Sequence, residues 1–178
     1  MHANQFLTLA DWKTKWPKSF ENCKVLELGS LNAAGHGPEG PHGTVRIYFN
    51  NCEFVGIDKQ SGLCVDIVVE AKDTKFTKNY FDTLISSSMF EHDPEWKESL
   101  AHNIQWIRPG SMLFFNFGAE GNNVHNCGGF HIIVPHKEFL SSCRKLGLEV
   151  LESFWEEEKW GGNSPGSYCV VCKKPESK

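Results

Sequence analysis

The chain has 178 residues, of which 40% are apolar, enough for one domain with a buried core and too few for two ordinary domains. Its formal net charge is −4, so it has no overall positive field that would gather a phosphate backbone, and a nucleic-acid partner is not favoured. No apolar run reaches the roughly 18 residues of a membrane span, and residues 1–10 lack the pattern of a signal peptide. We therefore expect a soluble, cytoplasmic protein that does not contact a membrane.

The first predicted element is a helix over residues 8–20, which starts with a Thr-x-x-Asp capping pattern and is interrupted near Pro17. It belongs to an N-terminal helical segment, residues 1–22. Short apolar runs between turn residues then predict the buried strands of a parallel sheet. These runs cover residues 24–28, 53–57, 64–69, 81–86 and 111–117.

Two further helices and a hairpin complete the pattern. Residues 94–107 open with Pro94 and stop before an Arg-Pro-Gly turn, and residues 135–147 end at a glycine, as helices do. Residues 149–157 and 167–174 flank a glycine-rich turn and predict an antiparallel hairpin. With no repeats or linkers, residues 1–178 are predicted to form a single α/β domain, a three-layer sandwich of Rossmann-like type.

The loop after the first strand is the most informative segment, because ligands of such sheets bind at the carboxyl ends of the strands. Gly29 follows the strand directly, where a missing side chain lets a ligand approach the backbone. The G-x-G-x-x-G phosphate fingerprint is absent, and Glu27 would repel a pyrophosphate. These features disfavour a dinucleotide and favour a cofactor with a cationic head and a nucleoside.

Two more carboxylates follow the next strands. Asp58 ends the second strand, where an acidic residue can accept hydrogen bonds from a ribose diol, and Glu70 follows the third. Each could instead cap a loop or a helix. Together with Glu27 they suit a positively charged ligand that carries several donors.

The segments VLELGS, FVGID, VDIVVEA, FDTLISSSMFEHD and IRPGSMLFF, in this order, resemble a class I S-adenosylmethionine-dependent methyltransferase over about residues 24–117. The resemblance implies a mostly parallel seven-stranded sheet of order 3-2-1-4-5-7-6. It also implies a methyl donor, S-adenosylmethionine, whose methionine, ribose and adenine parts lie along the rim of the sheet. The implied cofactor residues are Glu27, Gly29, Ser30, Leu31, Asn32, Asp58, Lys59, Glu70, Ala71 and Ser87.

The chain departs from the family's pattern in its first loop. Leu31 replaces a common second glycine, and an insertion within residues 33–43 precedes a helix expected to begin near Thr44. His36 and His42 lie in this insertion, which is either a lid over the acceptor or a surface loop.

Methyl transfer requires alignment of the acceptor with an already activated donor and, for some acceptors, removal of a proton. His92 is the candidate base, since histidine titrates near neutral pH; it could instead only shape its loop. The other candidate substrate residues are Ser88, Glu91, His125 and His131.

The cysteines do not indicate a metal site. The seven are scattered, and the Cys169-x-x-Cys172 pair lies on a predicted strand, which would point the two thiols to opposite faces. His125, Cys127 and His131 lack a fourth ligand of clear spacing. We therefore expect reduced, mostly structural thiols and activity without a metal.

The predicted function is methyl transfer to a small molecule, because no second domain is available to grip a polymer, and the Asn/Asp-Pro-Pro-Tyr segment of DNA amino-methyltransferases is absent. One alternative is a non-catalytic protein that binds S-adenosylmethionine or acts as a partner of another methyltransferase. A nicotinamide-dependent oxidoreductase is a more distant alternative. The sequence does not name the acceptor or the oligomeric state.

Overall fold

The computed structural model describes residues 3–32, 44–118, 132–161 and 167–176. Its centre is a seven-stranded sheet of order β3-β2-β1-β4-β5-β7-β6, which confirms the predicted topology. The first five strands run parallel, whereas β7 pairs antiparallel with both β5 and β6. The strands are β1 (Lys24–Leu28), β2 (Glu53–Asp58), β3 (Ile67–Val68), β4 (Phe81–Ser87), β5 (Ile107–Gly118), β6 (Glu149–Trp155) and β7 (Ser167–Lys173).

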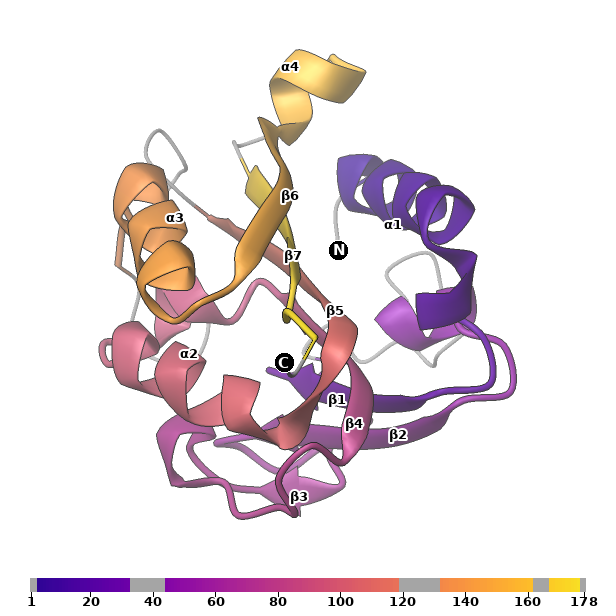
Figure 1. Cartoon of the computed structure of the whole chain (residues 1–178), viewed down its shortest axis with the longest axis vertical. Helices are drawn as coiled ribbons and strands as arrows, with labels where there is room; N and C mark the ends of the chain where they lie inside the picture. Colours follow the sequence, from indigo (N-terminus) through magenta and orange to yellow (C-terminus); the bar gives the residue numbers. More distant parts are fainter. Residues whose placement is uncertain (1–2, 33–43, 119–131, 162–166, 177–178) are drawn as a thin grey trace.

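Helices cover both faces of this sheet (Figure 1). On one face lie α2 (Trp96–Asn103) and α3 (His136–Lys145), and on the other lies α1 (Ala3–Lys15). A short helix, α4 (Glu156–Trp160), follows β6 and packs against α1. None of the helices within the described residues has the length and apolar character needed to cross a membrane.

The two faces of the sheet bury separate apolar clusters, and β5 shows how one strand supplies both. Leu113, Phe115 and Phe117 belong to the cluster under α2 and α3, while Met112 and Phe114 belong to the cluster under α1. This alternation follows from the two-residue period of a strand. Cys169 and Cys172 on β7 are divided between the clusters in the same way, as predicted.

Several predicted boundaries are wrong for local reasons. The first helix begins at Ala3 and not at Thr8, although it ends before Pro17 as expected. The predicted third strand is reduced to Ile67–Val68, since Cys64 has a φ of +72° that a strand cannot contain.

The helix expected from Thr44 is only a 3-10 helix, η2 (Val45–Tyr48). Its start is correct, since Thr44 Oγ1 accepts a hydrogen bond from the Arg46 N–H at 3.2 Å. It stops at Tyr48, because the next residue, Phe49, has an extended backbone with φ −98° and ψ 135°.

Two other helices differ in extent. The helix predicted over residues 94–107 divides into α2 and a 3-10 turn, η5 (Ile104–Trp106). The last residues of the predicted strand 149–157 begin α4 instead.

Candidate functional site

The first loop lies against the carboxyl end of β2, because its backbone continues the pairing of the two strands. The N–H groups of Gly29 and Ser30 both donate to the Ile57 carbonyl, at 2.9 and 3.0 Å. The Leu31 N–H donates to Asp58 Oδ2 at 3.3 Å. The loop is therefore held at the rim where β1, β2 and β4 end together.

Gly29 adopts a φ of +72°, a conformation that favours glycine. A Cβ atom built there would lie 2.4 Å from Cβ of Met89, in the segment after β4. The close approach of these two segments thus requires glycine at this position. It brings the first loop next to η4 (Phe90–His92), which carries the candidate base.

Asp58 is half-buried at the end of β2, and its carboxylate orders the surrounding backbone. Oδ2 accepts from Leu31, and Oδ1 accepts from the Gln60 N–H at 2.9 Å. A carboxylate has about four acceptor positions, so these two bonds leave capacity for a diol. Lys59, next to it, extends to the His92 carbonyl at 3.4 Å.

Glu27 lies deeper than a ligand-contacting carboxylate was expected to lie. It is 5% exposed, and its Oε2 accepts from Arg46 Nε at 2.8 Å. Burial raises the pKa of Glu27 to about 7, against the opposing effect of Arg46. Arg46 also reaches the Cys64 carbonyl and Asp66, so Glu27 anchors η2 and the segment before β3.

Glu70 and Ala71 lie beyond β3. Glu70 is exposed, and its carbonyl accepts from the Asp73 N–H in the 3-10 turn η3 (Ala71–Asp73). Ala71 is half-buried, and its carbonyl accepts from Asn103 Nδ2 of α2 at 2.7 Å. The predicted adenine residues are therefore positioned by α2.

The segment after β4 places its predicted residues at different depths. His92 is half-buried in η4, while Glu91 is 1% exposed. The backbone N–H groups of Glu91 and Gly118 donate to the Glu91 carboxyl group, yet burial raises its pKa to about 7. Its Oε2 has no hydrogen-bond partner in the described part of the chain.

Ser87 and Ser88 adjoin α1. Ser88 has a φ of +57°, its N–H donates to the Asn116 carbonyl at 2.8 Å, and its hydroxyl accepts from Gln5 Nε2 at 2.9 Å. Gln5 also donates to Asn116 Oδ1 at 2.6 Å. The N-terminal helix thus closes over the ends of β4 and β5.

A small cavity lies between α1 and these strand ends. Its free volume is about 10 Å³, about the space that one water molecule needs, and its lining includes Gln5, Thr8, Trp12, Ser87 and Asn116. The buried indole N–H of Trp12 has no hydrogen-bond partner among the described residues. The cavity therefore has polar groups in its lining and room for about one water molecule.

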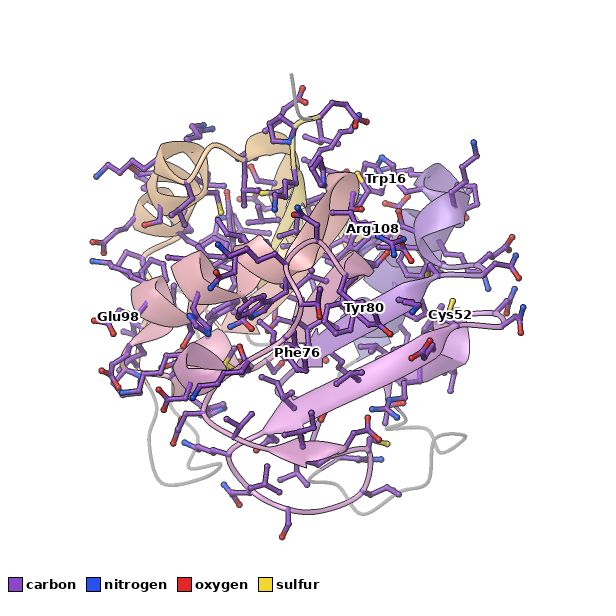
Figure 2. The ribbon with its side chains drawn as sticks, turned by 60° about the horizontal axis from the view of Figure 1, so that its bottom comes forward. Trp16, Cys52, Phe76, Tyr80, Glu98 and Arg108 are labelled. Atoms are coloured by element: carbon purple, nitrogen blue, oxygen red, sulfur yellow. The ribbon has the colours of Figure 1, made fainter. Side chains whose placement is uncertain are left out.

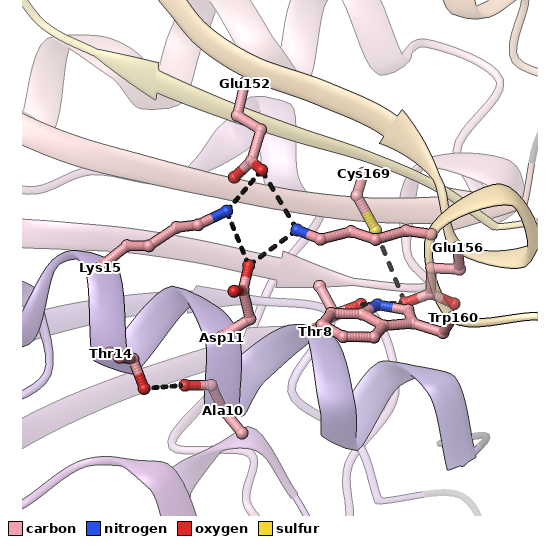
Figure 3. Close-up of polar contacts among 10 residues, drawn as sticks. Thr8, Ala10, Asp11, Thr14, Lys15, Glu152, Glu156, Trp160 and Cys169 are labelled. Atoms are coloured by element: carbon pink, nitrogen blue, oxygen red, sulfur yellow. Dashed lines mark hydrogen bonds and ion pairs between the residues drawn. The ribbon is translucent and has the colours of Figure 1, made fainter.

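A buried carboxylate, Glu156, binds two of the residues that line this cavity, and Figure 3 draws it beside Thr8 and Trp160. Glu156 Oε1 accepts from Thr8 Oγ1 and from Asn116 Nδ2, both at 2.9 Å, and Glu156 is 2% exposed. Burial raises its pKa, and its hydrogen bonds oppose the rise. Thr8 in turn accepts from the Trp160 indole at 3.0 Å.

Sequence reasoning did not identify Gln5, Thr8, Trp12, Asn116 or Glu156 as lining or supporting a site. Asn116 offered one signal, since it is a lone amide in the apolar run SMLFFNF. Four predicted substrate residues, and Cys127, lie outside the described part of the chain; the four are His36, His42, His125 and His131. Within that part, no group of three or more histidine, cysteine or acidic side chains could hold a metal.

Comparison with solved structures identifies the fold. The chain is similar to 1,6-didemethyltoxoflavin-N1-methyltransferase of Burkholderia thailandensis, solved with 1,6-didemethyltoxoflavin and S-adenosylhomocysteine bound: TM-score 0.69, 12% identity, 98% of this chain and 79% of that chain. A SAM-dependent methyltransferase from Archaeoglobus fulgidus gives a TM-score of 0.66 at 16% identity, over 95% and 94% of the two chains. The [4+2]-cyclase SpnF gives 0.67 at 17% identity, over 96% and 82%.

No family model and no curated protein matches the chain. At these low identities the likeness to solved structures shows the fold alone. The chain has the Rossmann-like fold of class I S-adenosylmethionine-dependent methyltransferases, as its sequence motifs predicted.

Proposed function

We propose that the chain is a methyltransferase that transfers the methyl group of S-adenosylmethionine to a small molecule. The observation that carries this proposal is the shared rim, where the Gly29 turn, the Asp58 carboxylate and the end of β4 meet. The Burkholderia thailandensis neighbour, which has the same fold, is a methyltransferase with S-adenosylhomocysteine bound.

In this proposal the donor lies along the rim. The backbone of Gly29, Ser30, Leu31 and Asn32, with Glu27 beneath, receives the methionine part. Asp58 and Lys59 lie beside the ribose, and Glu70 and Ala71 beside the adenine. Because Glu27 is buried and paired with Arg46, it would support donor binding mainly by holding η2 beside the first loop.

The acceptor would lie next to the cavity under α1, at the end of β4, because the cavity itself has room for only about one water molecule. Ser87 lies at the end of β4 and lines this cavity, so the donor's methyl group would face it. Ser88 and Gln5 would position the acceptor, and His92 of η4 is the candidate to receive a proton. The protein's contribution is then alignment and exclusion of water, since the sulfonium donor is already activated.

The test combines binding with product detection. Calorimetry of the purified chain should show binding of S-adenosylmethionine and S-adenosylhomocysteine, and none of reduced nicotinamide dinucleotide. Incubation of S-adenosylmethionine carrying an isotopically labelled methyl group with a metabolite panel should give a labelled product. Absence of binding to either S-adenosyl ligand would overturn the proposal.

A second function keeps the donor site without methyl transfer. One structure with this fold is described as a [4+2]-cyclase, so the fold alone does not establish methyl transfer. Tight binding of S-adenosylmethionine with no labelled product from any acceptor would favour this function, or that of a binding partner.

A further inference from the structure

Two cysteines lie side by side at the edge of the sheet opposite the candidate site. Cys23 precedes β1 and Cys52 precedes β2, and their Sγ atoms are 3.2 Å apart. The register explains the contact: Lys24 is paired with Glu53, so the two cysteines face each other one position earlier. Neighbouring strands run about 4.7–4.9 Å apart, within the range of about 4.4–6.8 Å between Cα atoms that a disulfide spans.

The two thiols differ in their access to solvent. Cys23 is 6% exposed, whereas Cys52 is half-buried and lies beside the start of β2 (Figure 2). Burial, with the adjacent Cys52, raises the pKa of Cys23 to about 12. Since the thiolate is the reactive form, Cys52 is the thiol that reacts first with a reagent in solution.

The other described cysteines provide a contrast. Cys143, Cys169 and Cys172 are fully buried in the apolar clusters, where a reagent does not reach them in the folded protein. Cys64 is half-buried and lies at the opposite edge, near Arg46. All six described cysteines are free thiols in this structure, which is the state from which oxidation would start.

We propose that Cys23 and Cys52 are a modification site that forms a reversible disulfide by exchange with a low-molecular-weight disulfide, such as oxidised glutathione. The Cys52 thiolate attacks one sulfur of the reagent, forms a mixed disulfide and releases one thiolate. Cys23 then attacks Cys52 Sγ, its proton passes to solvent or to the departing thiolate, and the second thiol is released. Two protein thiols are oxidised, and one disulfide is reduced to two thiols.

The bridge would close a loop between positions 29 residues apart, which contains β1, the first loop and η2. A disulfide that closes a loop of this length restricts the unfolded chain and so stabilises the folded one. Its position at the far edge leaves Gly29 and Asp58 unaltered. Formation of the Cys23–Cys52 bridge is therefore independent of the proposed methyl transfer.

The test treats the reduced full-length chain with oxidised glutathione under native conditions. Peptide mass spectrometry should find a Cys23–Cys52 cross-link, and thiol titration should find two thiols lost with no glutathione retained. The oxidised chain should melt about 5–10 °C higher than the reduced chain, as expected for a bridge of this loop length in a chain of this size.

Variants separate this route from other oxidation. Cys23→Ser should retain one glutathione on Cys52, because the resolving thiol is missing, and Cys52→Ser should form no cross-link. Cys64→Ser is the matched control and should keep both the cross-link and the rise in Tm. If the Cys52→Ser chain loses two thiols like the unaltered chain, or if the unaltered chain retains glutathione on Cys52, the proposal is wrong.

Discussion

Asp58 illustrates how one side chain connects the fold with the proposed function. It already fixes the backbone at Leu31 and Gln60, and a bound ribose would use its remaining acceptor positions. Asp58→Ala should weaken S-adenosylmethionine binding by about 1–3 kcal/mol, the cost of hydrogen bonds lost to a charged acceptor. Calorimetry measures this change.

The matched control for Asp58→Ala is Glu98→Ala, which removes an exposed carboxylate on α2. This control should bind the donor as the unaltered chain does. An Asp58→Ala chain that is folded, by circular dichroism, and binds with unchanged affinity would remove the ribose assignment.

Glu91 predicts a dependence of stability on pH. Its pKa is raised from 4.5 to about 7 by burial, so the folded state binds the proton more tightly than the unfolded state. The resulting stabilisation is fully present below about pH 4.5 and is lost as the pH rises through 7. At about 1.4 kcal/mol per pKa unit, the loss is about 3 kcal/mol.

The comparison variant is Glu91→Gln, which has no proton to lose. Urea unfolding at pH 5 and pH 8 should show the unaltered chain losing about 2.5 kcal/mol more than the variant between the two values. Parallel behaviour of the two chains would show that the carboxyl group is not held protonated.

At the residue scale, the sequence predicted where the site residues lie in the sheet better than it predicted which side chains they contact. Gly29 and Asp58 lie at the rim as expected, because the ends of parallel strands share an edge. The pairing of Glu27 with Arg46 was not predictable, since Arg46 follows a long loop whose path no local pattern specifies. The same holds for Gln5 and Ser88, which lie 83 residues apart.

At the scale of elements, α2 determines the position of the segment that carries the proposed adenine residues. Asn103 is fully buried, donates to the Ala71 carbonyl at 2.7 Å and accepts from the Thr74 hydroxyl at 2.9 Å. Asn103→Ala would remove both hydrogen bonds and with them the link of Ala71 to α2, leaving the Ala71 carbonyl only the longer bond from the Thr74 hydroxyl at 3.3 Å. The free energy of unfolding should fall by about 1–3 kcal/mol, and donor binding should weaken because Ala71 is no longer held.

Denaturant unfolding and calorimetry on the same preparation test both effects. Glu98→Ala, on the exposed face of the same helix, should change the free energy of unfolding by less than about 0.5 kcal/mol. An Asn103→Ala chain as stable as the unaltered one would contradict the assigned role of α2.

The type of an element was predictable where its hydrophobic pattern was strong. The residues at which the elements begin and end were not predictable. The apolar runs of β1, β4 and β5 are long and bounded by turn residues, so their pattern sufficed. The predicted third strand was shortened by the conformation of Cys64. The helix start at Thr8 was wrong because this hydroxyl bonds Glu156 of α4, which is distant in sequence.

At the scale of the whole molecule, the two ends of the chain hold each other. Asp11 and Lys15 of α1 form a four-charge network with Glu152 of β6 and Lys159 of α4 (Figure 3). The distances range from 2.6 Å between Lys15 and Glu152 to 3.1 Å between Lys159 and Glu152. The network attaches α1 to β6 and α4 through partly exposed ion pairs. Glu156 attaches the same helix through a buried hydrogen bond to Thr8.

Burial would raise the pKa of Asp11, but the hydrogen bonds from Lys159 and Lys15 outweigh it and lower the pKa below the usual value of 3.8. The ionised carboxylate thus stabilises the fold above about pH 4, and this contribution is lost as the pH falls below that value. Asp11→Asn should therefore cost about 1 kcal/mol at pH 7 and low salt, more than an isolated surface pair, because Asp11 pairs with two lysines that would then share Glu152 alone.

Three measurements of the free energy of unfolding test this role for Asp11. The cost of Asp11→Asn should shrink in 1 M salt, where the Debye length falls from about 10 Å at 0.1 M to about 3 Å, and it should decrease as the pH is lowered through the lowered pKa of Asp11. Asp73→Asn, a matched change at an exposed aspartate of η3, should have little effect under any of these conditions. If Asp11→Asn costs nothing at pH 7 and low salt, the network does not hold α1 in place, and the buried bonds of Gln5 and Thr8 hold it alone.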